Sequence, residues 1–389
     1  MSLRARLAQW IGVPTLVPAR KRTADRAIER LSPSAWVSVP LAGAAPTVQV
    51  GDVVAAGALI ARSQAGARWQ RRVHSPYQGA VVSVDERAIV VEGAPLPAAA
   101  GSAQHTGAAG LAPSDIIVTV REAGVTGLGG AMFPTYAKLG TSVDTVLVNG
   151  CESEPYFTCD HRVLAEHGDE VRCGLALAKR AVNADHGAIV DREAYYPAGY
   201  ERFLIRDELD RVLAPHALPR DVGVLVMNVQ SARALCVAVC GETPMIERVI
   251  TVAGDAVGRP GNYVVAIGTP VAHLLRVCEI DQARAATIIT GGPMMGRALE
   301  AGAVVTAGTG GLLALTADEV AAREEVPCIR CGRCLEACPV GLPVAKIVER
   351  PGPEVLRCME CGACQYVCPS AIPLVERLRL AKRREVEWD

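Results

Sequence analysis

Eight cysteines near the C-terminal end of the chain have the spacing that iron chemistry needs. Each of two runs contains three cysteines separated by two residues, then a fourth cysteine after three residues, followed directly by proline. The runs are Cys328, Cys331, Cys334 and Cys338, then Cys358, Cys361, Cys364 and Cys368. This pattern is typical of [4Fe-4S] ligation, because three thiolates from one tight loop reach three irons of one cubane. The sequence therefore predicts two such clusters.

In paired runs of this kind the fourth cysteine ligates the cluster of the other run. We therefore assign Cys328, Cys331, Cys334 and Cys368 to cluster 1, and Cys338, Cys358, Cys361 and Cys364 to cluster 2. The alternative is zinc, which needs four cysteines, usually as two Cys-x2-Cys pairs, and has no use for a proline-terminated repeat of eight. We favour the clusters.

The chain has six further cysteines among its 14, and they show no ligand spacing among themselves. We interpret all six as small buried hydrophobic residues. They are Cys151, Cys159, Cys173, Cys236, Cys240 and Cys278. A long chain with this many cysteines and no apolar secretory segment is expected in a reducing compartment. The net charge of -1 excludes a general attraction to nucleic acid.

A glycine-rich segment in the middle of the chain is a candidate phosphate cradle. Residues 124–135 follow an expected helix at 115–123 and contain Gly127, Gly129 and Gly130, with Lys138 just beyond. Glycines let backbone N–H groups approach a phosphate closely, and the lysine adds a positive charge. Only 4% of the residues are aromatic. We expect four of these few to cluster around the loop, as a planar cofactor ring would favour: Phe133, Tyr136, Tyr156 and Phe157.

The next expected strand, residues 143–148, ends in polar side chains. Asn149, Glu152 and Glu154 follow it directly. Ligands of parallel sheets bind at the carboxyl ends of the strands, so these groups are candidates for a cofactor site. Strands expected at 187–190 and 222–227 and helices expected at 160–182 and 229–239 complete an α/β pattern with a largely parallel sheet.

These motifs, in this order, resemble the RnfC family. The glycine loop, residues 149–156, residues 291–296 and the two cysteine runs carry the resemblance, which covers about residues 35–376. RnfC is the C subunit of the Rnf complex, a membrane-bound ferredoxin:NAD oxidoreductase coupled to ion translocation. Its central domain is similar to the subunit of respiratory complex I that binds FMN noncovalently and accepts hydride from NADH.

The resemblance implies roles for individual residues. Gly127, Gly129, Gly130 and Lys138 would hold the phosphate and ribityl chain of FMN, and Asn149, Glu152 and Asn228 would flank the flavin. Glu154 and Glu201 would line the NADH side. An alternative for Asn149 and Asn228 is that they cap the helices after their strands, a role that can coexist with flavin contact.

The expected fold is multidomain, mixing α/β and α+β modules. Residues 35–92 resemble the barrel-sandwich hybrid of lipoyl and biotinyl carriers. Residues 62–72 contain no lysine that could carry such a group, so we expect a structural role. Residues 93–113 have the Ala-, Gly- and Pro-rich composition of a linker. The predicted modules are an N-terminal extension (1–34), the barrel-sandwich hybrid (35–92), the linker (93–113), an FMN/NADH-binding α/β domain (114–246), a β-grasp module of the soluble-ligand-binding kind with a helix at 271–277 (247–304), connecting strands (305–324), a two-cluster ferredoxin domain (325–376) and a C-terminal tail (377–389).

The N-terminal residues Leu3, Leu7, Trp10 and Ile11 form one amphipathic helical stripe. Such a stripe could dock on a partner protein or a membrane surface, but we favour a short helix packed on its own domain. The resemblance implies a peripheral subunit on the cytoplasmic side of the bacterial inner membrane, joined to other Rnf subunits and indirectly to ferredoxin, with two [4Fe-4S] clusters, FMN and NAD(H).

Two other functions stay open from the sequence. One is a soluble NADH-dependent flavin and iron-sulfur reductase of the cobalamin-reductase kind, although the N-terminal barrel-sandwich module favours Rnf. The other is a cluster-wiring protein without NADH activity. It stays open because Tyr200 stands where related chains tend to carry a second glycine.

Overall fold

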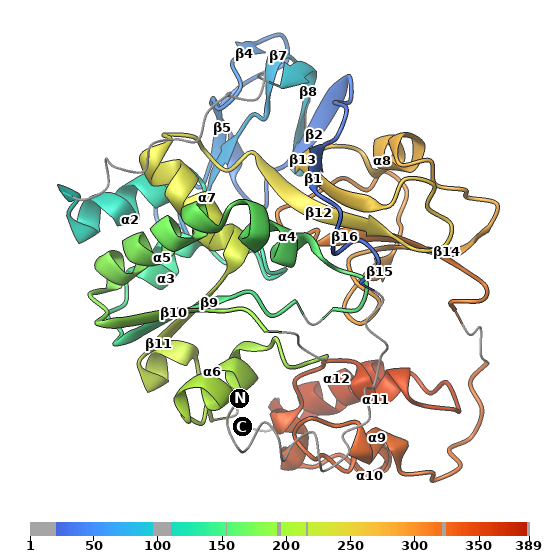
Figure 1. The fold of residues 1–389 in the computed structure, drawn as a ribbon. Helices are drawn as coiled ribbons and strands as arrows, with labels where there is room; N and C mark the ends of the chain where they lie inside the picture. Colours follow the sequence, from blue (N-terminus) through green and yellow to red (C-terminus); the bar gives the residue numbers. More distant parts are fainter. Residues whose placement is uncertain are drawn as a thin grey trace.

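The computed structural model describes residues 21–95, 110–152, 154–192, 196–214, 217–320 and 324–386. A β-barrel module lies at one end, a mixed α and β region forms the middle, and a small helical domain lies at the opposite end (Figure 1). The predicted N-terminal stripe at residues 3–11 and most of the predicted linker lie outside the described residues.

The barrel module consists of two small sheets around one apolar core. One sheet contains β2 (Trp36–Pro40), β8 (Ala88–Pro95), β7 (Tyr77–Val84) and β4 (Val53–Val54), and the other β3 (Ala45–Pro46), β5 (Leu59–Arg62) and β6 (Arg72–His74). Alternate residues face inward, so Val37 and Val39 of β2 and Ile89 and Val91 of β8 are buried. Strand β8 continues to Pro95, so residues 93–95 belong to the sheet and not to a linker.

The central α/β domain is built on three parallel strands in the order β10-β9-β11. These are β9 (Thr145–Asn149), β10 (His186–Val190) and β11 (Val224–Asn228). Helices α2 (Pro113–Glu122), α3 (Thr135–Leu139), α5 (Gly168–Val182) and α7 (Val229–Cys240) supply the core on one face. Helix α6 (Glu201–Leu209) packs on the other through Leu204 and Ile205. The predicted parallel sheet is confirmed.

The single helix expected at residues 160–182 is in fact two. Helix α4 (Cys159–Glu166) ends at His167, whose φ of -124° and ψ of 28° leave the helical region, and α5 then starts at Gly168. The break lets α4 pack on β12 and β1 while α5 packs on α7. Apolar periodicity continues through the break, so the sequence pattern did not reveal it.

The β-grasp region contains a six-stranded sheet in the order β1-β13-β12-β16-β14-β15. Its elements are β1 (Ile28–Arg30), β12 (Glu247–Ala253), β13 (Gly261–Ala266), β14 (Ala285–Thr290), β15 (Arg297–Ala298) and β16 (Gly311–Thr316), with helix α8 (Val271–Val277) as predicted. Strand β16 lies between β12 and β14, and all six of its residues are buried. Residues that we expected only to connect modules therefore supply an interior strand.

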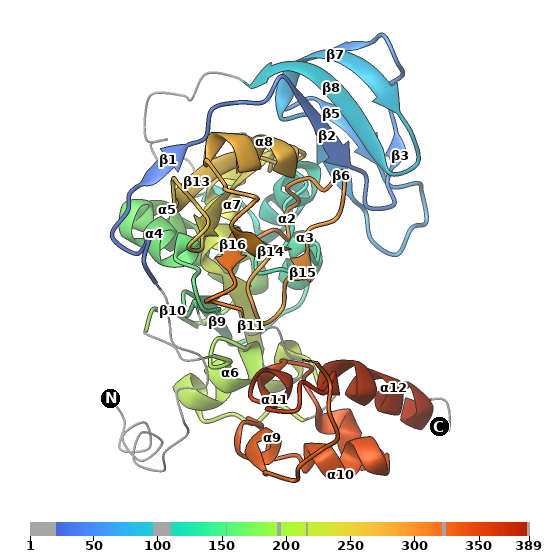
Figure 2. The same cartoon turned by 90° about the vertical axis from the view of Figure 1, so that its right-hand side faces the viewer.

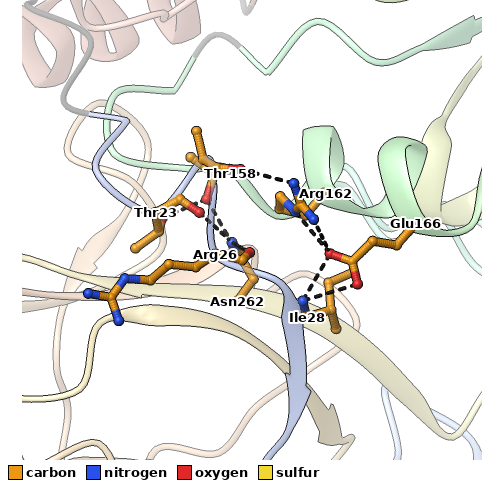
Figure 3. A network of polar contacts seen from close by, with 8 residues as sticks. Thr23, Arg26, Ile28, Thr158, Arg162, Glu166 and Asn262 are labelled. Atoms are coloured by element: carbon orange, nitrogen blue, oxygen red, sulfur yellow. Dashed lines mark hydrogen bonds and ion pairs between the residues drawn. The ribbon is translucent and has the colours of Figure 1, made fainter.

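The N-terminal extension is hydrogen-bonded both to the α/β domain and to the β-grasp region. The amide of Ile28, the first residue of β1, donates to the carboxylate of Glu166 on α4 at 3.0 Å. The side-chain amide of Asn262 on β13 donates to the carbonyl of Thr23 at 3.0 Å (Figure 3). Thr158 joins the same network through hydroxyl contacts to Thr23 and Asn262. The segment 21–31 is thus part of the central fold.

The C-terminal domain is a pair of similar loop-helix units. It contains α9 (Arg333–Glu336), α10 (Val344–Glu349), the 3₁₀ helix η3 (Pro353–Arg357), α11 (Ala363–Tyr366) and α12 (Leu374–Val386). Leu378 and Ala381 of α12 are buried in the core of this domain. Helix α12 therefore extends the domain into the predicted C-terminal tail. Within the described ranges, no helix is both long and apolar enough to cross a membrane.

Candidate flavin and cluster sites

The two cysteine loops have the same backbone conformation. Gly332 and Gly362 have φ values of 78° and 79°, and Arg330 and Glu360 have φ values of 54° and 57°. The left-handed residues turn each loop back on itself. In the first loop the amide of Arg330 lies 3.4 Å from the sulfur of Cys328, and the second loop repeats this contact with the same distance between Glu360 and Cys358. Amides that donate to sulfur stabilise thiolate ligands.

The predicted cysteine sets each surround one cavity. Cys328, Cys331, Cys334 and Cys368 line a cavity of about 580 Å³. Cys338, Cys358, Cys361 and Cys364 line a second, smaller one. Each cavity thus collects three cysteines from one run and the fourth from the other. Four cysteine sulfurs are the donor set of a [4Fe-4S] cluster, and we refer to these as cluster site 1 and cluster site 2.

The two sites differ in burial. Cys328 and Cys331 of cluster site 1 are exposed, whereas Cys361 and Cys364 of cluster site 2 are buried. Burial, followed by the negative charge of neighbouring thiolates, raises the pKa of Cys364 to about 12. Four crowded thiolates need a positive centre to hold their charge, and bound iron supplies it.

The loop of cluster site 2 docks directly on the flavin domain. The hydroxyl of Tyr196 donates to the backbone carbonyl of Cys361 at 2.5 Å and lies 3.1 Å from the hydroxyl of Tyr200. Tyr196, Cys361 and Ala363 form a small buried cluster, against which Tyr200 and Met294 pack. Both views show the cluster domain on the α6 side of the central sheet (Figures 1 and 2). Tyr200, which stands where related chains tend to carry a second glycine, therefore lies at this domain contact.

The glycine loop lies at the carboxyl end of β11, as expected for a cofactor cradle. Gly129 and Gly130 are exposed, and a Cβ built on Gly130 would point into open space. A Cβ on Gly129 would lie 3.5 Å from the Cβ of Asn228. The loop is anchored to the start of α7, because the hydroxyl of Ser231 accepts a hydrogen bond from the amide of Leu128 at 2.9 Å. This open backbone beside the sheet edge fits the phosphate-bearing arm of FMN.

The four aromatic residues expected around the loop separate into two groups. Phe133 packs edge-on against Trp69 of the barrel module at 5.0 Å, and the hydroxyl of Tyr136 accepts the amide of Gln70. Tyr156 and Phe157 instead pack against β16. The prediction of one aromatic cluster for a flavin ring was therefore wrong, because these rings join the α/β domain to its neighbours.

Lys138 pairs with a residue predicted for the other cofactor. Its ammonium donates to the carboxylate of Glu201 at 3.2 Å and to the carbonyl of Val226 at 3.1 Å. Both side chains are partly exposed, so the pair is available to a ligand at the sheet edge. The structure thus brings together one residue of the predicted FMN set and one of the predicted NADH set.

Asn149 and Asn228 end neighbouring strands and use their amides differently. Asn228 caps α7, since its oxygen accepts the amide of Gln230 at 2.9 Å, and its nitrogen donates to the carboxylate of Asp160. Asn149 caps no helix. Its oxygen accepts the amide of Cys151 at 2.9 Å, and its nitrogen donates to the carbonyl of Gly199 at 2.8 Å. The capping alternative therefore holds for Asn228 alone.

Glu152 belongs to a half-buried acidic cluster that the sequence did not reveal. Its carboxylate accepts the amides of Asp160 and His161 at 3.1 Å and 3.3 Å and lies 3.2 Å from the sulfur of Cys159. Burial and the nearby Asp160 carboxylate raise the pKa of Glu152 to about 7. Burial also raises the pKa of Asp160, although hydrogen bonds from Gln230 and Asn228 oppose this. The cluster lies where α4 and α7 start.

Lys21 stabilises the same segment from the N-terminal extension. Its ammonium donates to the backbone carbonyls of Glu152, Glu154 and Phe157 at 2.7, 2.8 and 2.5 Å. Burial lowers the pKa of Lys21, and the neighbouring Glu152 raises it. Lys21 is one residue of a basic run far from the site in sequence, so the sequence pattern does not predict its role. Only the tertiary structure shows that it contacts this segment.

Glu154 fixes the loop of residues 291–296. Its carboxylate accepts the amides of Met294 and Met295 at 3.3 Å and 3.0 Å, and burial raises its pKa to about 7. A Cβ on Gly292 would lie 2.3 Å from this carboxylate, so the glycine permits the contact. Because Met294 packs against the cluster of Tyr196, Cys361 and Ala363, Glu154 is connected to the loop of cluster site 2 through Met294.

Comparison with known proteins gives this arrangement a family. The chain is 33% identical over 367 residues to the C subunit of the ion-translocating oxidoreductase complex of Rhodobacter capsulatus, covering 82% of this chain and 70% of that protein. It is 32% identical to the C subunit of the proton-translocating ferredoxin:NAD(+) oxidoreductase complex of Clostridium ljungdahlii, covering 83% of this chain and 80% of that protein. The chain belongs to the RnfC family. The predicted family is thereby confirmed.

Three domain models agree with the RnfC assignment. The RnfC barrel sandwich hybrid domain matches residues 12–98, the Nuo51 FMN-binding domain matches residues 120–195, and the 4Fe-4S dicluster domain matches residues 321–369. These matches confirm the predicted barrel-sandwich, flavin and two-cluster modules. A solved NAD+-reducing [NiFe]-hydrogenase in the air-oxidized state matches 70% of this chain and 54% of its own at 19% identity, with a TM-score of 0.45.

Proposed function

We propose that this protein is the NADH-linked electron-transfer subunit of an Rnf-type ion-translocating membrane complex. It binds FMN noncovalently at the glycine loop and two [4Fe-4S] clusters in the C-terminal domain, and it exchanges electrons between NAD(H) and partner proteins. Its curated relatives are named as C subunits of such complexes, which supports this proposal. The observation that carries it is the contact of Tyr196, in the flavin domain, with the Cys361 loop of cluster site 2.

The residues that would hold FMN meet at the carboxyl ends of β9 and β11. The open backbone of Gly129 and Gly130 and the ammonium of Lys138 suit a phosphate, and Asn228 lies beside the loop. When bound, FMN supplies the conversion between hydride transfer with NAD(H) and single-electron transfer with the clusters. The protein contributes position and electrostatics. One such contribution is the segment around Glu152, whose position is fixed by hydrogen bonds from Lys21 and Asp160.

We propose an order for the clusters within this protein. Cluster site 2 lies against the flavin domain, because its loop contacts Tyr196, and Met294 of the β-grasp region packs at the same place. Cluster site 1 has the exposed cysteines, and exposed apolar side chains surround it, among them Ile329 and Val326. Cluster 2 would therefore exchange electrons with the flavin, and cluster 1 would exchange them with a partner protein.

The remaining parts of the proposal concern the setting. We propose that the protein is peripheral, on the cytoplasmic side of the inner membrane, because NAD(H) is a cytoplasmic electron carrier. Other Rnf subunits would be its direct partners, and ferredoxin would be an indirect one. Nothing in the described site favours a soluble cobalamin-reductase-like function.

The test is anaerobic mixing of the purified full-length protein, carrying FMN and both clusters, with NADH or NADPH. Visible absorbance would follow the flavin, and low-temperature EPR would follow the clusters. The expected result is that NADH bleaches the flavin band and that reduced [4Fe-4S] signals appear. Clusters that respond to dithionite but not to NADH, in a preparation without bound flavin, would leave only the cluster-wiring function.

A further inference from the structure

Three of the cysteines outside the cluster runs converge at one point of the flavin domain. The sulfur atoms of Cys173, Cys236 and Cys240 all lie within 4.8 Å of one another. The sulfurs of Cys173 and Cys240 are 3.6 Å apart. Cys236 is fully buried, while Cys173 and Cys240 are half-buried. The expectation of a small buried hydrophobic residue therefore holds for Cys236, whereas Cys173 and Cys240 are half-buried and their sulfurs converge on it.

The helix pair explains the convergence. Cys236 and Cys240 are four residues apart on α7, so they lie on the same face of that helix. Cys173 is on α5, next to Gly174, where a Cβ would lie 1.9 Å from the backbone oxygen of Ala232 on α7. Only glycine permits so close a helix approach, and this approach brings the sulfur of Cys173 to the other two. The sequence signal was the i, i+4 pair on α7.

We propose that these three cysteines form a binding site for a single thiophilic metal ion of the Zn²⁺ class. With a Zn–S bond of about 2.3 Å, two sulfurs of a tetrahedral site are about 3.8 Å apart. The Cys173–Cys240 separation of 3.6 Å is close to this value, and all three separations lie within 4.8 Å. Binding releases the three thiol protons and leaves the fourth position on the ion to water. Access is from the side of the half-buried Cys173 and Cys240.

The same geometry argues against a third iron-sulfur cluster. In a cubane each thiolate ligates a different iron, so the sulfurs lie farther apart than around one ion. A disulfide would need only two of the sulfurs and would leave the third without a function. A metal ion uses all three. It would clamp α5 to α7, the helix that Asn228 caps beside the glycine loop.

The experiment uses the full-length protein, purified anaerobically with its clusters and FMN. After addition of Zn²⁺ and washing with a weak chelator, elemental analysis should find one tightly held zinc per chain. X-ray absorption at the zinc edge, which iron does not obscure, should show a sulfur shell at about 2.3 Å. Cys173→Ala and Cys240→Ala should each weaken zinc binding by more than the roughly 10- to 100-fold that loss of an outer hydrogen-bonding partner costs.

The matched control is Cys278→Ala, which removes a buried cysteine of the β-grasp core and should leave zinc binding unchanged. Iron and flavin contents report whether each variant folds, and two single variants guard against failure of either one. Three results would overturn the proposal: no retained zinc, zinc retained equally by both variants, or a Cys173–Cys240 disulfide found by mass spectrometry in a protein that binds no zinc.

Discussion

Cluster site 1 and cluster site 2 share a backbone conformation but differ in what covers them. The loop glycines Gly332 and Gly362 have φ values within one degree of each other. Yet Cys331 is exposed, while Cys361 is buried against the flavin domain. The reduction potential of a cluster depends on solvent exposure and on hydrogen bonds to its ligands. We therefore expect equal local geometry with unequal burial to give the two clusters different reduction potentials.

The difference in burial also suggests which site exchanges electrons within the protein and which exchanges them with a partner. A buried site with a tyrosine hydrogen bond suits internal transfer, because its surroundings are fixed. An exposed site with Ile329, 66% exposed, beside it suits docking of a partner. The predictions below test whether the environment, rather than the cysteine loop, distinguishes the sites.

The largest effect should come from removing one ligand at each site. Either Cys361→Ala or Cys331→Ala should lower the iron content by about half, because each cluster holds four irons. Only Cys361→Ala should also abolish the reduction of the remaining cluster by NADH. Low-temperature EPR after NADH addition is the measurement. If cluster 2 stayed silent in Cys331→Ala and cluster 1 responded in Cys361→Ala, the proposed order would be reversed.

A matched glycine pair separates loop geometry from loop surroundings. Gly332→Ala and Gly362→Ala should each destabilise the domain by about 1–2 kcal/mol, because alanine disfavours the left-handed region. Gly362→Ala should cost more, since its Cβ would lie 3.2 Å from the carbonyl of Met294, whereas Gly332 faces open space. Thermal loss of the cluster absorbance measures both. Equal midpoints would show that the loop of residues 291–296 does not press on the second cysteine loop.

The tyrosine contact can be tested without disturbing either cluster. Tyr196→Phe removes the hydrogen bond to the carbonyl of Cys361 and should weaken docking of the two domains by about 1 kcal/mol, which is about fivefold. Tyr200→Phe is the control, because its hydroxyl contacts Tyr196 but not the loop. Stopped-flow absorbance after NADH addition should show slower cluster reduction in Tyr196→Phe. Identical rates in the two variants would remove Tyr196 from the route.

The smallest expected effect is a pH dependence confined to cluster 2. Burial raises the pKa of Glu154 to about 7, so this carboxyl loses its proton as the pH rises through 7. The new negative charge near Met294 and Cys361 disfavours reduction. The potential of cluster 2 should therefore fall, by less than about 60 mV per pH unit. Redox titration with EPR between pH 6 and pH 8 measures it.

Glu154→Gln should flatten this dependence at cluster 2, and cluster 1 should show none in either protein. Glu152 also has a pKa of about 7 and still titrates in the variant. The difference between the two proteins therefore measures the contribution of Glu154 alone. A slope that persisted in Glu154→Gln would assign the effect to the other buried carboxyls.

The sequence determined the chemistry of this protein. The eight-cysteine pattern predicted both ligand sets, since the spacing rule is local and the structure groups the same cysteines around each cavity. Apolar patterns located the three parallel strands β9, β10 and β11 and the helices α2, α7 and α8, the last with its bounds. Glycines at 127–130 marked the loop because backbone approach needs them.

Only the tertiary structure decided how these parts face one another. The ammonium of Lys21 reaches carbonyls more than 130 positions away. Residues 311–316 occupy the interior of a sheet because they pair with strands from elsewhere in the chain. The burial of Cys361 and the convergence of Cys173 with Cys236 and Cys240 likewise depend on domain and helix contacts. Such contacts join residues distant in sequence, so no local pattern encodes them.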